Sequence, residues 1–237
     1  MQSGGFYGLF LSTELNERAP KRSFWREHAI AVYRSRAPSQ FRQGIAMPPT
    51  VTLVRHGETA WSAAGRHTGR TDIPLSAEGE RRALALRGRL AEQTFDRVFA
   101  SPLQRAARTC ALAGFGDRAV VDPDLLEWDY GDYEGRTTHD ILQSRPGWLI
   151  FRDGCPNGEQ AADVGQRVDR VIARLRAVED RAIVFSSAHV LRVLTARWLG
   201  LPPSEGRLFV LNTASLSVLA YEHDSKDEPV IALWNAV

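Results

Sequence analysis

The sequence contains few cysteines, no long apolar run and no pair of histidines at the spacing of a metal site. Cys110 and Cys155 are its only cysteines. Two thiols are too few for a disulfide framework and are typical of proteins in a reducing compartment. No apolar run approaches the roughly 18 residues that cross a membrane, and Gly4–Leu11, although apolar, is short and has no charged region before it, unlike a signal peptide. These absences predict a cytoplasmic protein without a membrane contact.

Metal and nucleic-acid binding are also disfavoured by what is missing. The six histidines include no i, i+4 pair and no Cys/His ligand spacing, so we expect neither a metal nor another cofactor. Within the domain, aromatic residues do not alternate with basic ones as they do in a nucleic-acid platform, so no nucleic-acid partner is expected. The composition, 43% hydrophobic and 24% charged, is that of a globular chain able to bury a sizeable core.

The charge of the chain is distributed unevenly. Residues 1–49 hold seven Lys/Arg and three Asp/Glu, a net +4, whereas the remainder holds 23 against 25, a net −2. Met47 is the only methionine besides Met1 and stands three residues before the first predicted strand. We therefore interpret residues 1–46 as a poorly structured or non-native N-terminal extension and residues 47–237 as one domain.

Strands and helices are predicted to alternate along this domain. Apolar runs bounded by turn residues predict strands at 50–55, 97–100, 119–121, 182–185, 216–221 and 230–234. Helical spacing and capping residues predict helices at 76–92, 102–113, 161–178 and 190–199. This order indicates an α/β fold, a three-layer α/β/α sandwich with a mostly parallel central sheet and a hairpin of the last two strands at its edge. Residues 122–159 are too rich in Gly, Pro, Asp and Tyr to belong to the core framework.

Polar residues follow three of the predicted strands at the point where each strand ends. They are Arg55-His56-Gly57, Ser101-Pro102-Leu103-Gln104-Arg105 and Ser186-Ser187-Ala188-His189. Because ligands of open α/β sheets bind at the carboxyl ends of the strands, these side chains can converge on one ligand.

The residue types in these segments suit an anionic, phosphorylated substrate. Arg55 and Arg105 would offer bidentate donors to a phosphoryl group, and the predicted helix at Pro102 would add the favourable dipole of its N-terminus. Gly57 would let the backbone approach the ligand, because it has no Cβ. A fourth segment brings Glu127, which lies between Leu126 and Trp128 and suits a proton donor to a leaving alkoxide.

Together these segments resemble the histidine phosphatase superfamily, also called the phosphoglycerate mutase-like family, over about residues 50–222. The most specific stretch runs from Arg55-His56-Gly57-Glu58-Thr59 through His67-Thr68-Gly69-Arg70-Thr71-Asp72 to Ser76. Segments 127–135 and 152–159 are similar to the branch that contains sedoheptulose-1,7-bisphosphatase and small bacterial acid phosphatases. The resemblance implies the phosphoglycerate mutase-like fold and a metal-independent phosphatase of small phosphorylated metabolites, such as sugar phosphates or bisphosphates. Family members often form dimers through sheet edges, so a homodimer is compatible with it.

The resemblance also implies roles for individual residues. His56 would be the nucleophile that becomes a phosphohistidine, because a neutral imidazole needs no base to deprotonate it. Arg55 and Arg105 would surround the transferred group, and Glu127 would protonate the leaving oxygen and then activate water. The remaining substrate contacts implied by matching positions are Ser62, Thr68, Gly69, Tyr130 and Ser187, with Arg192 and His223 meeting a distal hydroxyl or a second phosphate.

The chain departs from the family pattern after its fourth predicted strand. Where the family has His-Gly-His, this sequence has Ser187-Ala188-His189, as counting back five residues from Arg192 shows. A serine donates a hydrogen bond but carries no positive charge, so we expect weaker stabilisation of the transition state, by about 10²-fold or more.

Three functions therefore stay open. The first is an active phosphomonoesterase, and the second is a phosphate-ester-binding pseudoenzyme with impaired turnover. The third is a phosphoglycerate mutase, which is disfavoured because only about 60 residues separate Glu127 from Ser187, too few for the insert expected in cofactor-dependent mutases.

Overall fold

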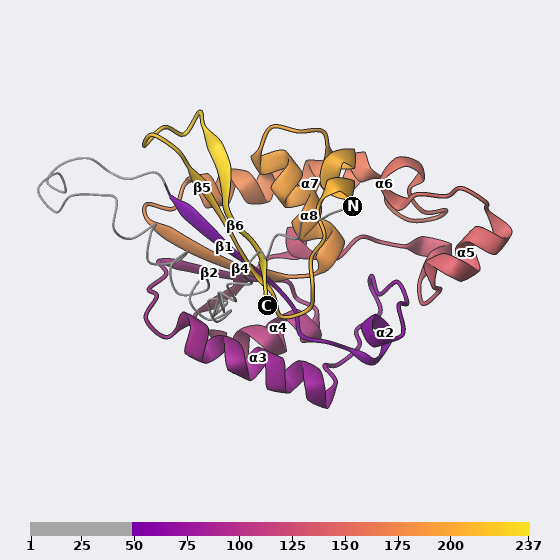
Figure 1. Cartoon of the computed structure of the whole chain (residues 1–237), viewed down its shortest axis with the longest axis horizontal. Helices are drawn as coiled ribbons and strands as arrows, with labels where there is room; N and C mark the ends of the chain where they lie inside the picture. The colour runs from indigo at the N-terminus through magenta and orange to yellow at the C-terminus, as the bar shows by residue number, and fades with distance from the viewer. Residues whose placement is uncertain (1–48) are drawn as a thin grey trace, which may run out of the picture. The chain divides into compact units, whose positions relative to one another are not determined.

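The computed structural model describes residues 49–237, and the predicted extension at 1–46 lies outside the described residues. One six-stranded sheet has the order β3-β2-β4-β1-β5-β6 (Figure 1). The strands are β1 (Thr50–Arg55), β2 (Arg97–Ala100), β3 (Ala119–Val121), β4 (Arg181–Ser186), β5 (Leu216–Tyr221) and β6 (Pro229–Ala236). The first four run parallel, and β5 and β6 form an antiparallel hairpin at the edge beside β1. The predicted mostly parallel sheet with an edge hairpin is confirmed.

Helices cover both faces of this sheet because successive side chains of each strand point to opposite sides. Leu53 of β1 and Val184 of β4 pack with helices α7 (Ala161–Arg176) and α8 (Ala188–Trp198). The next residues in each strand, Val54 and Phe185, pack with α3 (Ala77–Leu90) and α4 (Gln104–Leu112) on the other face. Figure 1 shows these helix pairs on either side of the strands. The three-layer α/β/α architecture is confirmed.

Residues 122–159 contribute large side chains to the core, which the sequence prediction did not expect of this segment. They contain α5 (Thr138–Ser144), α6 (Ile150–Asp153) and the short 3₁₀ turns Pro123–Leu125 and Gly131–Tyr133. Trp128, Tyr130 and Trp148 are at most 3% exposed and lie in the same cluster as the apolar faces of α7 and α8. The Gly, Pro and Asp content of the segment sets its irregular path, whereas its large aromatic side chains bury its inner surface.

Two predicted helix starts differ from the structure, each because a distant carboxylate takes part in capping. Helix α4 begins at Gln104 rather than Pro102, and the Gln104 N–H donates to Asp72 Oδ1 at 2.8 Å. Helix α8 begins at Ala188 rather than Val190, and its first turn donates to Glu127. Both N-termini are thus satisfied by carboxylates from elsewhere in the chain, as orphan N–H groups require.

The smaller elements join these layers. They are α2 (Ala60–Ala63) and the 3₁₀ turns Gly116–Arg118 and Pro203–Leu208. Among the helices of residues 49–237, none is long and apolar enough to cross a membrane.

Candidate active site

The polar residues that follow β1 and β4 meet at the carboxyl edge of the sheet, as predicted. The two strands are neighbours, with Arg55 of β1 opposite Ser186 of β4. The His56 N–H donates to the Ser186 carbonyl at 2.9 Å, which continues the ladder one residue past β1. His56 and Ser187 therefore leave adjacent strand ends at the same level.

His56 is a buried, neutral imidazole with one nitrogen available. It is 4% exposed, and its Nδ1 lies 2.6 Å from the Gly57 carbonyl. A carbonyl oxygen can only accept, so Nδ1 carries the proton and Nε2 keeps its lone pair. Burial, and next the charges of Arg55 and Arg105, lower the pKa of His56 well below 6.5. The side chain is thus in the protonation state that a nucleophile needs.

Gly57 is required for packing, not for ligand access as the sequence interpretation had it. A Cβ at this position would lie 2.5 Å from the carbonyl oxygen of Gly79, the third residue of α3. The Gly57 N–H donates to Thr109 Oγ1 at 3.0 Å, and that hydroxyl donates to the Arg105 carbonyl. The backbone beside His56 is therefore held between α3 and α4.

Arg105 is fully buried and binds the loop 68–72 through both of its terminal nitrogens. Nη1 donates to the Thr71 carbonyl at 3.0 Å, and Nη2 donates to the carbonyls of Thr68 and Gly69 at 2.9 and 2.8 Å. Its Nε has no partner among the described residues. Arg105 consequently does not present the bidentate fork predicted from the sequence, but it keeps one N–H without a partner among those residues.

The same loop is held from its other side by Glu134. Glu134 Oε1 accepts from the N–H groups of Gly69 and Thr71, at 2.8 and 3.2 Å. A Cβ on Gly69 would lie 2.5 Å from the Trp128 carbonyl, so a glycine is needed where the loop crosses that segment. The hydroxyl of Thr68 donates within the loop, to the Arg66 carbonyl at 3.2 Å. The loop is thus fixed beside the site from both sides. Its carbonyls bind Arg105, and its amides bind Glu134.

Arg55 and Ser187 each bring another buried polar atom without a partner. Arg55 Nη1 donates to the Leu211 carbonyl at 2.5 Å, while its Nε is unpaired among the described residues. Ser187 is fully buried, and its Oγ likewise has no partner there. Burial lowers the pKa of Arg55 and of Arg105, and the negative charge of Glu127 opposes this effect for both. Unpaired buried donors are costly, so an acceptor that binds them is favoured.

Glu127 is 3% exposed and both of its carboxylate oxygens are held by backbone N–H groups. Oε1 accepts from Trp128 and Val190, each at 2.9 Å, and Oε2 accepts from His189 at 3.0 Å. Each oxygen can accept about two hydrogen bonds. Oε2 accepts from a single donor, so it is the oxygen that can also bind a proton.

Arg167 on α7 holds the segment that carries Glu127. Its guanidinium donates to the carbonyls of Asp124, Leu126 and Glu127. It also donates to both oxygens of Glu159, at 2.7 and 3.0 Å. Arg167 was not predicted as a site residue, although the spacing of Val164, Val168 and Val171 places it on the apolar face of that helix.

Tyr130, His189 and Arg192 lie beside the site. The Tyr130 hydroxyl is 2.6 Å from His189 Nδ1, and the charges of Glu127 and Arg105 act on it. Arg192 stacks on Phe151, with 4.6 Å between its guanidinium carbon and the ring centre, and donates to the carbonyls of Gly206 and Arg207. Tyr130 lies among the charged groups Glu127 and Arg105, and Glu127 and Arg55 act on Arg192. His189 lies in the first turn of α8 and contacts Tyr130.

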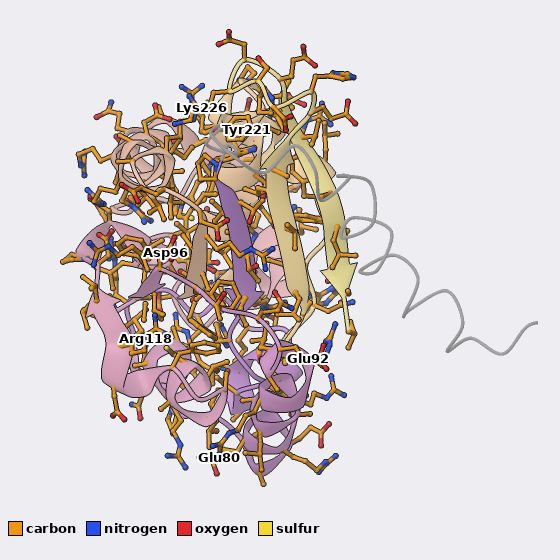
Figure 2. All side chains as sticks on the ribbon, turned by 90° about the vertical axis from the view of Figure 1, so that its left-hand side faces the viewer. Glu80, Glu92, Asp96, Arg118, Tyr221 and Lys226 are labelled. Carbon is orange, nitrogen blue, oxygen red and sulfur yellow. The ribbon has the colours of Figure 1, made fainter. Side chains whose placement is uncertain are left out.

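Two of the predicted substrate contacts are placed differently. The Ser62 hydroxyl donates to the Thr59 carbonyl and accepts from the Thr59 N–H, which completes a capping box of α2. His223 is exposed in the β5–β6 turn and pairs with Glu228 at 2.6 Å. Tyr221 and Lys226, which flank His223 in sequence, lie close together in Figure 2, and β5 runs antiparallel to β1, so that this turn follows the end of β5 beside the start of β1. His223 is therefore at the opposite edge of the sheet from His56.

The same turn holds the side chains that could bind a metal ion. Within residues 49–237, Glu222, His223 and Glu228 are the group whose potential ligand atoms lie within 4.8 Å of one another, and all three are exposed. The residues around His56 do not belong to this group.

Comparison with known proteins places this site in a family context. The family model of the histidine phosphatase superfamily (branch 1) matches residues 51–237. An acid phosphatase of Mycobacterium tuberculosis (strain ATCC 25618 / H37Rv) is 41% identical over 185 residues, covering 76% of this chain and 91% of that protein. Sedoheptulose 1,7-bisphosphatase of Saccharomyces cerevisiae is 32% identical over 256 residues, covering 79% and 93%. The solved structure of an open reading frame from Mycobacterium tuberculosis has a TM-score of 0.74 at 38% identity, covering 80% of this chain and 98% of that one.

Proposed function

This chain belongs to branch 1 of the histidine phosphatase superfamily, and from that premise we propose that it hydrolyses small phosphorylated metabolites, sugar phosphates or bisphosphates among them, through a phosphohistidine on His56. The named relatives support this class without fixing one substrate, since one is an acid phosphatase and another a sugar bisphosphatase.

One observation carries the proposal: a neutral buried imidazole lies beside three unpaired buried donors. His56 Nε2 keeps a lone pair, and the unpaired atoms are Arg55 Nε, Arg105 Nε and Ser187 Oγ. A phosphoryl group supplies acceptor oxygens for such donors, and preorganised donors of this kind are worth about 3 to 4 kcal/mol each when they act on the transition state. The site therefore has both the nucleophile and the oxygen-binding groups of a phosphoryl-transfer centre.

The reaction consists of two displacements at phosphorus. His56 Nε2 attacks the phosphorus, the P–O bond to the alcohol breaks, and the proton on Glu127 moves to the leaving oxygen. Water then attacks the phosphohistidine while Glu127 accepts its proton, so that the P–N bond breaks and inorganic phosphate is released. Arg55, Arg105 and Ser187 hold the phosphoryl oxygens in both steps. Arg192 lies where it can meet a more distant part of the substrate.

Steady-state phosphate release tests this proposal. The substrates are a panel of sugar phosphates, including sedoheptulose bisphosphate, and an aryl phosphate, with His56→Ala as the blank. We expect turnover above the blank at a kcat of about 1 s⁻¹ or more on at least one ester. Rates equal to the blank on every ester, with a folded protein, would exclude the phosphatase.

A second candidate, a phosphate-ester-binding protein with impaired turnover, is favoured by one observation. Ser187 is a neutral group at the strand end next to His56, so the site has one cation fewer than the family pattern. The double substitution Ser187→His with Ala188→Gly separates the candidates. A rise in kcat of about 10²-fold would indicate an impaired native site, whereas an unchanged kcat would indicate that other residues compensate.

A further inference from the structure

The Tyr130 hydroxyl is a buried donor surrounded by the charged groups of the site. Tyr130 is 2% exposed. The charges of Glu127 and Arg105 act on its hydroxyl. Burial, reinforced by Glu127, raises the pKa of Tyr130 well above 10, so the phenol keeps its proton. The O–H group therefore stays available as a hydrogen-bond donor.

His189 is the hydrogen-bond partner of that hydroxyl. Its Nδ1 lies 2.6 Å from the Tyr130 oxygen. Burial and the nearby charges of Arg192, His67 and Arg55 lower the pKa of His189 well below 6.5, so its ring is neutral. Its backbone N–H is separately bound to Glu127 Oε2, which fixes the start of the side chain. The imidazole is also packed against Phe151 and Trp128, with ring centres 5.3 and 6.2 Å away.

A neutral Tyr–His pair has two arrangements of its protons. In one, the Tyr130 proton is donated to Nδ1. In the other, Nδ1–H donates to the Tyr130 oxygen, and the Tyr130 proton is directed to a third group. A phosphoryl oxygen is an anionic acceptor and binds an O–H more strongly than a neutral nitrogen does, so a bound phosphate favours the second arrangement.

We propose that His189 is a positioning residue, which holds the Tyr130 oxygen so that the Tyr130 proton is donated to a phosphoryl oxygen bound at His56. This inference rests on the proposed function and deepens it. Tyr130 and Ser187 then provide two neutral O–H donors to the phosphoryl group. Ser187 itself supplies no positive charge there. The substrate-touching residue is Tyr130, and His189 acts through it.

Titration with tungstate, a phosphate-like oxyanion, tests this pairing independently of turnover. Tyr130→Phe and His189→Phe each remove the hydrogen bond and keep an aromatic ring, and each is expected to weaken the tungstate Kd at least tenfold. The double variant should bind no more weakly than either single variant, because both substitutions remove one donor. His189→Asn, whose amide lies near the position of Nδ1, should recover the Kd to within about threefold. His189→Gln, whose amide lies near Nε2, should not recover it.

The outcomes separate this inference from the proposed function. A tungstate Kd for Tyr130→Phe within twofold of that of the unchanged chain would overturn it, as would additive losses in the double variant or equal rescue by Asn and Gln. If His189→Phe does not fold, Tyr130→Phe and the Asn and Gln variants carry the test. Phosphate release equal to that of His56→Ala would overturn the phosphatase, whereas the tungstate series would still decide the role of His189.

Discussion

At the scale of single residues, the site depends on a close backbone contact between two glycines as well as on its polar side chains. His56 is held in place by the contact between Gly57 and Gly79, because neither position has space for a Cβ. The contact joins the residue after the nucleophile to the first turn of α3, and it therefore couples the stability of the domain to the position of His56.

Gly57→Ala should destabilise the domain by about 2 kcal/mol, because its Cβ would lie 2.5 Å from a backbone oxygen that cannot rotate away. Gly88→Ala is the matched control. Gly88 is exposed within α3 and nothing lies within 4 Å of the position of its Cβ, so this change should stabilise the domain by about 0.5 kcal/mol. Urea unfolding of the two variants measures the difference. A similar free energy of unfolding in both would mean that the contact at Gly57 relaxes without cost.

Site residues were predictable where they stand next to one another in a short stretch of sequence. Arg55 and His56 follow one strand directly, so the sequence alone predicts their shared edge. Glu134 and Arg167 were not predictable as supports of the site, because their partners are 65 and about 40 residues away in the chain. His223 is the opposite case. Its position in the sequence matches the family pattern, but the residue does not lie near His56.

At the scale of elements, α7 supports the segment that carries Glu127 through a single side chain. Arg167 is 7% exposed and satisfies three backbone carbonyls and one carboxylate from that segment. The segment has little regular structure of its own, so these hydrogen bonds replace the ladder that a strand would have.

Arg167→Leu should cost about 3 kcal/mol of unfolding free energy, because it leaves Glu159 and the carbonyls without their buried partner. The matched control is Arg170→Leu on the same helix. Arg170 pairs with Asp124 at the surface, so its loss should cost much less than that of Arg167. Chemical denaturation gives both values, and kcat should fall in the Arg167 variant alone. Equal costs would mean that the buried network adds nothing beyond a surface ion pair.

Elements with a regular apolar period were predicted to within about two residues at each end, whereas residues 122–159 were not. Helices α3 and α7 bury one face along three or more turns, so their spacing is visible in the sequence. Helices α5 and α6 have seven and four residues, too short for such a pattern. Their place is set by long-range packing of Trp148 and Phe151 in the core, which no local pattern reports.

At the scale of the whole molecule, three histidines connect the stability of the fold to pH, His56 buried and His67 and His189 partly buried. Burial lowers the pKa of His67 to about 4, and burial with neighbouring cations lowers the pKa of His56 and His189 well below 6.5. In the unfolded chain the same groups titrate near 6.5. The unfolded chain thus binds more protons below that pH, which favours unfolding.

The free energy of unfolding should therefore be highest above about pH 6.5 and fall as the pH decreases toward 4. His67→Phe should make this fall shallower, because the variant has one fewer partly buried group that must take up a proton on unfolding. The exposed His139→Gln serves as the control. Urea unfolding between pH 4 and 8 measures the slopes. Identical slopes in the unchanged chain and the His67 variant would show that His67 does not contribute to the pH dependence.

The binding of Arg105 by the loop 68–72 has a consequence for how the site can be observed. One guanidinium holds three carbonyls of this loop and also keeps its Nε without a partner among the described residues. Any ligand that moves Arg105 must also alter the loop, whose Gly69 and Thr71 amides are bound to Glu134. The hydrogen-exchange rates of these two amides would thus serve as a spectroscopic reporter of site occupancy that works with any ligand, substrate or not.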